Sequence, residues 1–456
     1  MRSKLLTVAI AAGLGLTSFS ALAATPKSQP ARVTVDAATL QQLQAQLAAL
    51  QAKVSELESK QEAQADAQVE TAKAVNDVQV AAAKPTDDLT KRLDKLAKVV
   101  DNTHVGGTMF FDVSNIDHNE KVGNGRNRQV DGHGAVNGTG FDVKRFYLTV
   151  DHTFDDVWSA NLTTDFNYQS TLSQTSLFVK KAYVQGKFDP LFTVRFGSAD
   201  MPWIPFVEKA YGYRYVENTI TDRSFEGGRS GSTATAGGVG AFGNSADWGV
   251  HVLGATTGNN AINYQVSVVN GRGFRNLTRS KSVDTEARLG YSPIEQLILA
   301  VGGYTGKRGN DVENGQPTRT ATRGDALVAW RDKTWGVGVE YFHSENWDDI
   351  LKYQGTTPAP LAIKDKADGY SAFADWHFYN QWAVFARYDH VSYKYKTVTN
   401  IERELKDKYY NAGVSYDVLK NLKLALVYKH NQLDGPFATP YHYKTNEVGF
   451  WGMLSF

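Results

Sequence analysis

The sequence predicts an all-β transmembrane barrel of about 16 antiparallel strands, preceded by an N-terminal α-helical coiled-coil arm. Three observations support this prediction. Short segments of alternating apolar and polar residues fill residues 105–456, their connections alternate between tight turns and long polar stretches, and the last strand ends on an aromatic residue, Phe456. Alternation puts successive side chains on opposite faces, so one face can contact lipid and the other a lumen. We therefore expect a barrel in the outer membrane of a Gram-negative bacterium.

An export signal is expected at the start of the chain. Arg2 and Lys4 precede an apolar run, and residues 21–23 have the small side chains of a cleavage site. We assign residues 1–23 to a signal peptide and residues 24–36 to a spacer. No other stretch approaches the roughly 18 apolar residues of a spanning helix, so strands must make any membrane crossing.

Residues 37–101 are predicted to form a periplasmic helical arm, interrupted at Pro85. Apolar residues recur there at alternating steps of three and four, which is the spacing of a coiled-coil seam. The seam residues are Leu40, Leu43, Leu47, Leu50, Val54 and Leu57. We expect the arm to hold protomers together in a homotrimer. The alternative is a solvated tether, including one that binds the cell wall.

The barrel strands are predicted from the period of two and from turn residues between them. They are residues 105–114, 141–153, 157–168, 176–188, 191–199, 247–256, 261–270, 283–292, 297–307, 323–331, 335–345, 367–378, 382–393, 407–418, 422–433 and 443–456. An even number returns the last strand to the side of the first, so the arm and the carboxyl end are both expected in the periplasm. In the last strand one face carries the apolar residues expected to contact lipid and to be recognised by the barrel-assembly machinery: Val448, Phe450, Leu454 and Phe456.

Overall charge and composition exclude several functions. The chain has 49 basic and 48 acidic residues, a net charge of +1, and loss of Arg2 and Lys4 makes it about −1. This balance gives no indication of nucleic-acid binding. The chain has no cysteine and no Gly-x-Ser-x-Gly nucleophile turn. We expect no enzyme activity, no cofactor and no metal site.

Basic residues on the lumenal face of strands and in two external loops are candidates for contact with anions. In the second strand Phe146 and Leu148 are expected to face lipid, which turns Arg145 to the lumen; the same rule turns Lys181 and Arg195 inward, among lumenal acids. The other candidates lie in the long loop at about 200–246 and in a later external loop: Lys209, Arg214, Arg223, Arg229, Arg272, Arg275 and Arg279. The long loop carries as many acids as bases. Its arginines could therefore bind anions, or could form salt bridges that hold the loop in place.

Several segments resemble the phosphate-selective porins O and P and related porins that carry a periplasmic coiled coil. They are FDVKRFYL at 141–148, residues 158–166, KAYVQGKF at 181–188 and VRFG at 194–197. The resemblance implies a homotrimeric channel of sixteen strands whose third external loop folds inward and narrows the pore. It also implies a preference for anions, with Arg145 and Arg195 at the family's basic strand positions. A full lysine ring is not matched, and the acids of the long loop favour a broader preference for anions or small carboxylates.

We therefore expect passive diffusion of small hydrophilic solutes through an outer-membrane porin that prefers anions. One alternative is a sugar porin, in which Phe206, Tyr211, Tyr213 and Tyr215 would line a track for sugar rings. Another is a barrel that only anchors the arm and tethers the outer membrane to the cell wall.

Overall fold

A computed structural model describes residues 37–83, 87–122, 127–128, 137–168, 176–223, 241–315, 317–348, 364–396, 400–436 and 440–456. The expected signal peptide, the spacer and Arg229 lie outside these residues. The chain divides into two compact units, residues 1–92 and residues 93–456. The break expected at Pro85 falls between helices α1 (Ala37–Ala83) and α2 (Asp87–Asp101).

Helix α1 carries the predicted coiled-coil seam. Leu47, Leu50, Val54 and Leu57 are each at least 50% exposed in the single chain, and the side chains of Leu40 and Leu43 are not among those described. The apolar seam is thus accessible to a second helix, and the coiled coil stays a prediction. Neither helix of the arm, nor any other described helix, is long and apolar enough to cross a membrane.

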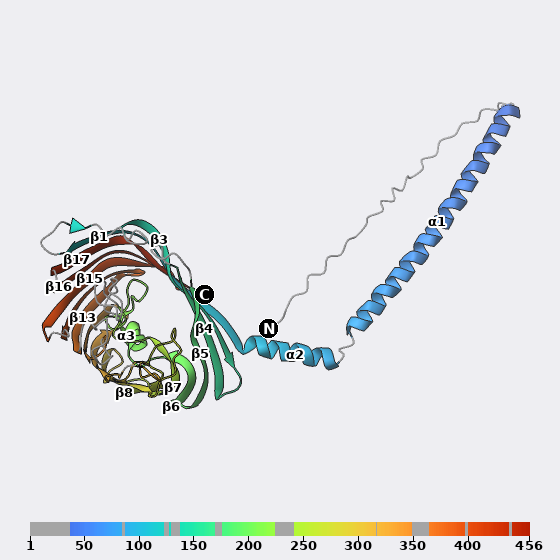
Figure 1. Cartoon of the computed structure of the whole chain (residues 1–456). Helices are drawn as coiled ribbons and strands as arrows, with labels where there is room; N and C mark the ends of the chain where they lie inside the picture. The colour runs from blue at the N-terminus through green and yellow to red at the C-terminus, as the bar shows by residue number, and fades with distance from the viewer. Residues whose placement is uncertain are drawn as a thin grey trace. The chain divides into compact units, whose positions relative to one another are not determined.

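The second unit is a closed antiparallel β-barrel, which confirms the predicted fold class (Figure 1). Sixteen long strands make up the wall in the described residues, and a further two-residue strand, β2 (Asn127–Arg128), pairs with the outer end of β1. The long strands are β1 (Thr103–Val122), β3 (Gly138–Thr153), β4 (Trp158–Tyr168), β5 (Ser176–Asp189), β6 (Phe192–Asp200), β7 (Ala246–Ala255), β8 (Ala261–Val269), β9 (Asp284–Ser292), β10 (Leu297–Gly306), β11 (Ala321–Arg331), β12 (Trp335–Glu345), β13 (Lys364–Tyr379), β14 (Trp382–Lys396), β15 (Glu402–Leu419), β16 (Leu422–Pro436) and β17 (Pro440–Ser455). Each predicted strand matches one of them.

Strand β1 closes the barrel by pairing with β3 on one side and β17 on the other. The last residue completes this seam, because the N–H groups of Gly107 and Phe456 each donate to the other residue's carbonyl oxygen at 3.0 Å. The Phe456 ring lies 6.2 Å from the ring of Phe146, centre to centre. In β17 Val448 and Phe450 are exposed on the outer face. The apolar face predicted for the last strand therefore points away from the lumen.

Aromatic side chains form two groups on the outer face of β12 to β16. Toward the short turns, Trp335 stacks on Trp376 with ring centres 5.2 Å apart. Toward the other end, Tyr370 pairs with Tyr388 at 6.2 Å. Amphipathic rings at two heights are typical of the two interfaces of a bilayer.

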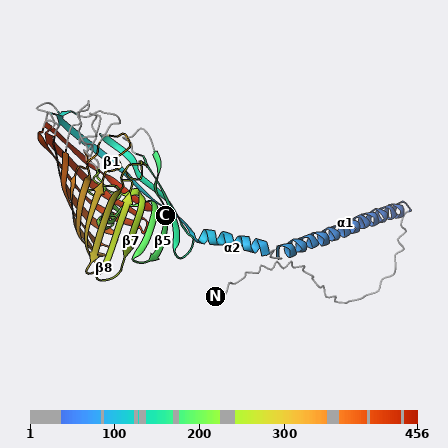
Figure 2. The same cartoon turned by 60° about the horizontal axis from the view of Figure 1, so that its bottom comes forward.

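The connection between β6 and β7 enters the barrel. Its residues 201–223, here called the inner loop, include helix α3 (Ile204–Tyr211), which lies inside the ring of strands (Figure 1). Figure 2 shows the strands of the wall from another side. Gly212 ends α3 in a left-handed conformation, with φ of 81°, and donates its N–H to the Glu208 carbonyl oxygen. That backbone conformation favours glycine and turns the chain away from the helix axis.

We predict that Gly107→Ala destabilises the closing seam. A Cβ there would lie 2.4 Å from the Phe456 ring and 2.8 Å from the Tyr147 carbonyl oxygen, so the chain must shift. The expected loss is about 1–3 kcal/mol of unfolding free energy, seen as a lower temperature of barrel unfolding on a detergent gel. Gly324→Ala in β11 is the control, because nothing lies within 4 Å of its Cβ position. Equal unfolding temperatures for the two variants would contradict the prediction.

Candidate pore constriction

Both ends of the inner loop are held to the wall by buried hydrogen bonds. Trp203, 0% exposed, donates its backbone N–H to the Glu286 carboxylate at 3.0 Å and its indole N–H to the Glu340 carboxylate at 2.8 Å. Thr221 also donates its hydroxyl to Glu340, at 3.3 Å. Because buried donors and acceptors are costly to leave unpaired, these bonds fix both ends of the inner loop against β9 and β12.

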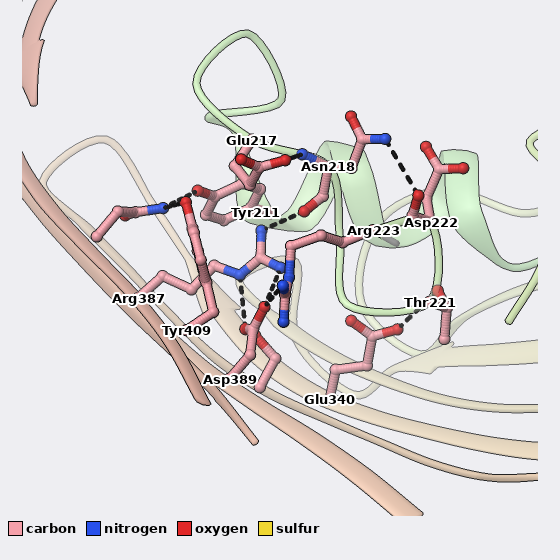
Figure 3. Close-up of polar contacts among 12 residues, drawn as sticks. Tyr211, Glu217, Asn218, Thr221, Asp222, Arg223, Glu340, Arg387, Asp389 and Tyr409 are labelled. Atoms are coloured by element: carbon pink, nitrogen blue, oxygen red, sulfur yellow. Dashed lines mark hydrogen bonds and ion pairs between the residues drawn. The ribbon is translucent and has the colours of Figure 1, made fainter. Parts of the chain in front are cut away.

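Wall arginines bind the loop backbone. Arg331 of β11 donates to the carbonyl oxygens of Ala210 at 2.8 Å and Tyr211 at 3.2 Å, and pairs with Asp375 at 2.6 Å. Arg387 of β14 likewise donates to the Asn218 carbonyl oxygen, as Figure 3 shows. Each guanidinium thus links the carboxyl end of α3, or the turn after it, to the barrel.

Arg223 of the inner loop is an internal salt-bridge residue. It is 5% exposed, its Nε lies 3.2 Å from an Asp389 oxygen, and its Nη2 pairs with Asp407 (Figure 3 shows Arg223 and Asp389). The guanidinium also lies 4.6 Å from the centre of the Tyr409 ring. The sequence left two interpretations open for the arginines of this loop, anion binding and salt bridges. Arg223 forms salt bridges.

The aromatic residues proposed as a sugar track are not available as a track. Tyr211, Tyr213 and Tyr215 are at most 7% exposed. Tyr213 stacks on Phe385 of β14 with ring centres 4.1 Å apart, and Tyr211 contacts Phe373 of β13 at 5.4 Å. The three tyrosines therefore fill the space between the inner loop and the wall, so their assignment to a sugar track is wrong; Phe206, the fourth candidate, is partly buried.

The inner loop packs on one side of the lumen and leaves a cavity on the other side. This cavity, of about 390 Å³, lies between the loop and strands β1 and β3 to β6. Its lining residues are Thr108, Phe110, Tyr147, Thr149, Asn161, Thr163, Lys180, Lys181, Asp200, Pro205, Glu208, Lys209, Arg214 and Ser245. It is the candidate constriction of the pore.

Charge in the constriction is positive. Among the described residues, Lys180, Lys181, Lys209 and Arg214 line it together with two acids, Asp200 and Glu208. Lys181 pairs with Asp200 at 2.7 Å, and Arg214 pairs with Glu208 and, at 3.5 Å, with Asp222. Within the described part of the chain neither Lys180 nor Lys209 has an ion pair. Two cations at this point are therefore not neutralised by a contacting carboxylate.

Lys180 was missed by the sequence analysis because a β-bulge breaks the period of two. Between β4 and β5, Thr163 lies opposite Lys181 and Thr164 opposite Val179, so Lys180 is the extra residue. It turns inward, where its Nζ lies 3.2 Å from the Tyr147 hydroxyl. A second bulge, at Lys144 in β3, brings that side chain to within 3.6 Å of Asp112. The sequence did offer a sign of both bulges. In each strand two basic residues are adjacent, Lys144–Arg145 and Lys180–Lys181, where strict alternation would turn one of them to lipid.

The other predicted basic residues lie apart from the cavity lining. Arg145 faces inward as expected and pairs with Asp165 at 2.8 Å. Arg195 donates to the Gln185 side chain at 2.8 Å. In the connection between β8 and β9, Arg275 stacks over Phe178 at 4.1 Å and Arg272 donates to the Asn310 side chain at 3.1 Å; Arg279 is exposed.

Comparison with known proteins agrees with the fold. Residues 120–204 match the model of the family described as phosphate-selective porin O and P, which confirms the resemblance over that segment. Comparison with curated protein sequences gives no match.

Two similar solved structures have a TM-score of 0.50. They are the outer membrane channel DcaP of Acinetobacter baumannii, with 12% identity over 78% of this chain and 97% of that chain, and an anion-selective porin from Comamonas acidovorans, with 10% identity over 78% of this chain and 99% of that chain. At these identities the likeness concerns the fold. The family match and the fold point to an outer-membrane channel rather than an enzyme.

We predict that Arg223→Ala loosens the inner loop, because it removes the cation that pairs with buried Asp407 and leaves Asp389 with Arg387 alone as its ion partner. The expected cost is about 3–5 kcal/mol, with a larger and noisier single-channel conductance as the loop leaves the wall. The control is Arg279→Ala, which removes the same charge from an exposed position. Unchanged conductance of Arg223→Ala would show that the salt bridge does not position the loop.

We also predict that Glu217 stabilises the loop except in strong acid. Burial raises the pKa of Glu217, but Lys429 and Lys144 more than offset this and hold the pKa at about 2, below the ordinary 4.5. A lowered pKa in the folded state contributes stability above 4.5, and this stability is lost as the pH falls through 2. Glu217→Gln should therefore lower the unfolding temperature at neutral pH, and this difference should shrink in acid. The exposed Glu295→Gln is the control, and a pH-independent difference for Glu217→Gln would contradict the prediction.

Proposed function

We propose that this outer-membrane porin conducts small hydrophilic solutes passively and prefers anions such as phosphate or small carboxylates. The observation that carries the proposal is the excess of cations in the constriction. In the part of the chain that the structure describes, neither Lys180 nor Lys209 has a contacting carboxylate, and two further cations stand beside two acids. An unneutralised charge at 4 Å is worth about 1 kcal/mol even in water, which favours an anion over a neutral solute about fivefold.

The polar lining supports dehydration of a passing anion. Hydroxyl groups of Thr108, Thr149 and Thr163 line the cavity, and Thr149 and Thr163 are hydrogen-bonded to each other at 3.0 Å. Hydroxyls donate to anions as well as accepting from one another. An anion that lies between these threonines and Lys209 can therefore replace hydrogen bonds from water with hydrogen bonds from the protein. The mixed signs and the size of the cavity favour a general preference for anions over a dedicated phosphate site.

The arm is proposed to lie in the periplasm and to assemble the barrel as a homotrimer. Its exposed apolar seam supports this assignment, because such a seam is stable only against another helix. Lipid of the outer membrane and the barrel-assembly machinery are the other partners proposed. Binding of the arm to cell wall is the competing proposal for the same helix.

The test of anion preference is the zero-current potential of the purified protein in a planar bilayer under a potassium chloride gradient. We expect an anion-selective potential that moves toward zero in Lys180→Gln/Lys209→Gln. Lys333→Gln/Lys420→Gln is the matched control, since it removes two exposed lysines from short turns. Cation selectivity, or an equal shift in the control, would contradict the proposal. Absence of conductance would favour the barrel as an anchor.

Deletion of residues 37–100 tests the arm. We expect the trimer to dissociate at a lower temperature in detergent while single-channel conductance is retained, because the seam lies in the arm and the constriction lies in the barrel. An unchanged oligomer melting profile would exclude the coiled coil as the trimer contact. Binding of the full-length protein, and not the deleted form, to isolated cell wall would favour the tether.

A further inference from the structure

Lys180 is a nearly buried cation at the constriction. Its side chain is 7% exposed and lines the cavity, and within the described part of the chain it forms no ion pair. Burial of an ammonium group is costly unless other groups of the protein contact it. The contacts that Lys180 does make therefore decide whether its charge stays available to a solute.

Two aromatic rings contact the Lys180 ammonium group. Its Nζ lies 4.5 Å from the centre of the Tyr147 ring and 5.8 Å from the centre of the Phe274 ring, and it donates to the Tyr147 hydroxyl at 3.2 Å. The face of an aromatic ring attracts a cation within about 6 Å, more strongly where water is excluded. A ring carries no net charge, unlike a carboxylate. The two rings thus stabilise the ammonium group without cancelling its positive charge.

The carboxylates around Lys180 have cationic partners of their own. Four acids interact with its charge through space: Asp165, Asp200, Glu208 and Asp222. Each of them already forms an ion pair with another cation, which is Arg145, Lys181 or, for the last two, Arg214. A lysine side chain is long and flexible. A Lys180 that the rings no longer hold can therefore turn toward one of these acids and share it.

Phe274 belongs to the connection between β8 and β9, and this connection is anchored to the start of β7. The carbonyl oxygen of Phe274 accepts from the Trp248 indole N–H at 3.1 Å. The N–H of the preceding residue, Gly273, donates to the buried Asp247 carboxylate at 3.0 Å. Gly273 has φ of 76°, a left-handed conformation that favours glycine. These bonds on both sides of Phe274 hold its ring in contact with Lys180.

The same ring takes part in a second cation contact. It lies 5.7 Å from the ring of Phe178, centre to centre, and the Arg275 guanidinium lies 4.1 Å from Phe178 and 5.7 Å from Phe274. Phe178 is opposite Asp165 in the ladder of β4 and β5, two residues before Lys180. The connection between β8 and β9 therefore joins the wall through rings and cations at the place where β5 bulges.

We propose that Phe274, together with Tyr147, is a positioning residue for the anion preference of the pore, because it holds Lys180 as an unneutralised cation at the constriction. Without the Phe274 ring, Lys180 turns to share a carboxylate, and the constriction loses that charge. The connection between β8 and β9 thereby controls the charge of the constriction through an uncharged side chain. This inference rests on the proposed function, since it names the residues that maintain the preference for anions.

The test measures the zero-current potential under a potassium chloride gradient for the full-length wild type, Lys180→Gln, Phe274→Leu and the double variant. We expect Phe274→Leu to lower the ratio of chloride to potassium permeability about two- to fivefold, and the double variant to equal Lys180→Gln. Phe274→Tyr keeps a ring face and should retain the wild-type ratio. The matched control is Phe192→Leu, at an exposed position on the outer face of β6, which should also retain it.

Two outcomes would overturn the inference and leave the proposed function intact: an unchanged ratio in Phe274→Leu, and an equal loss from Phe274→Leu with and without Lys180. A crystal structure of Phe274→Leu is an independent readout. An ion pair between Lys180 and a carboxylate there would support the inference, and an ammonium group that has not moved from the Tyr147 ring would overturn it. A wild type without anion preference would contradict the proposed function, and the crystal structure of the variant would then decide the inference by itself.

Discussion

Closure of the backbone hydrogen-bond ladder between β1 and β17 is the constraint on which the rest of this barrel depends. In hydrocarbon each unpaired N–H or C=O group costs several kcal/mol, so a sheet can cross the bilayer only without free edges. Strand β1 pairs with both β17 and β3, and the mutual hydrogen bonds of Gly107 and Phe456 extend the pairing to the last residue. Once the ring is closed, each residue must face either lipid or lumen, and the inner loop has a fixed wall to pack on.

Buried ion pairs then hold the inner loop against one side of the lumen and leave the other side open. Arg223, Arg331 and Arg387 bind carboxylates and loop carbonyl oxygens on the β11 to β15 side, where the tyrosines of the loop exclude water. Breaking such a pair leaves a buried charge and is strongly unfavourable, so the loop cannot easily move across the lumen. The open cavity beside β1 and β3 to β6 is the consequence. Its cations are less completely paired, and this difference separates residues that hold the loop from residues that can attract a solute.

The chain as a whole carries a net charge of only +1. Any electrostatic preference of this protein must therefore come from where individual charged side chains are placed. Bulges at Lys144 and Lys180 add cations to the inner face of strands whose period of two would otherwise turn them to lipid. On the outer face of β13 and β14, strict alternation instead keeps Lys366 and Lys394 outside and directly opposed. The same residue type is therefore directed to the inner or the outer face of the barrel wall by one residue of register.

The sequence by itself determined the barrel, its sixteen long strands and the inward position of Arg145, because a period of two and short turns are local properties. Only the tertiary structure decided the constriction. Local pattern cannot show a bulge, so Lys180 was missed. It also cannot show what a loop packs against, so Tyr213 stayed a candidate sugar contact under the alternative function and Arg223 remained ambiguous. The partners of these side chains lie up to 202 residues away in the chain, as Ser415 does from Tyr213. Such contacts exist only after the ring has closed.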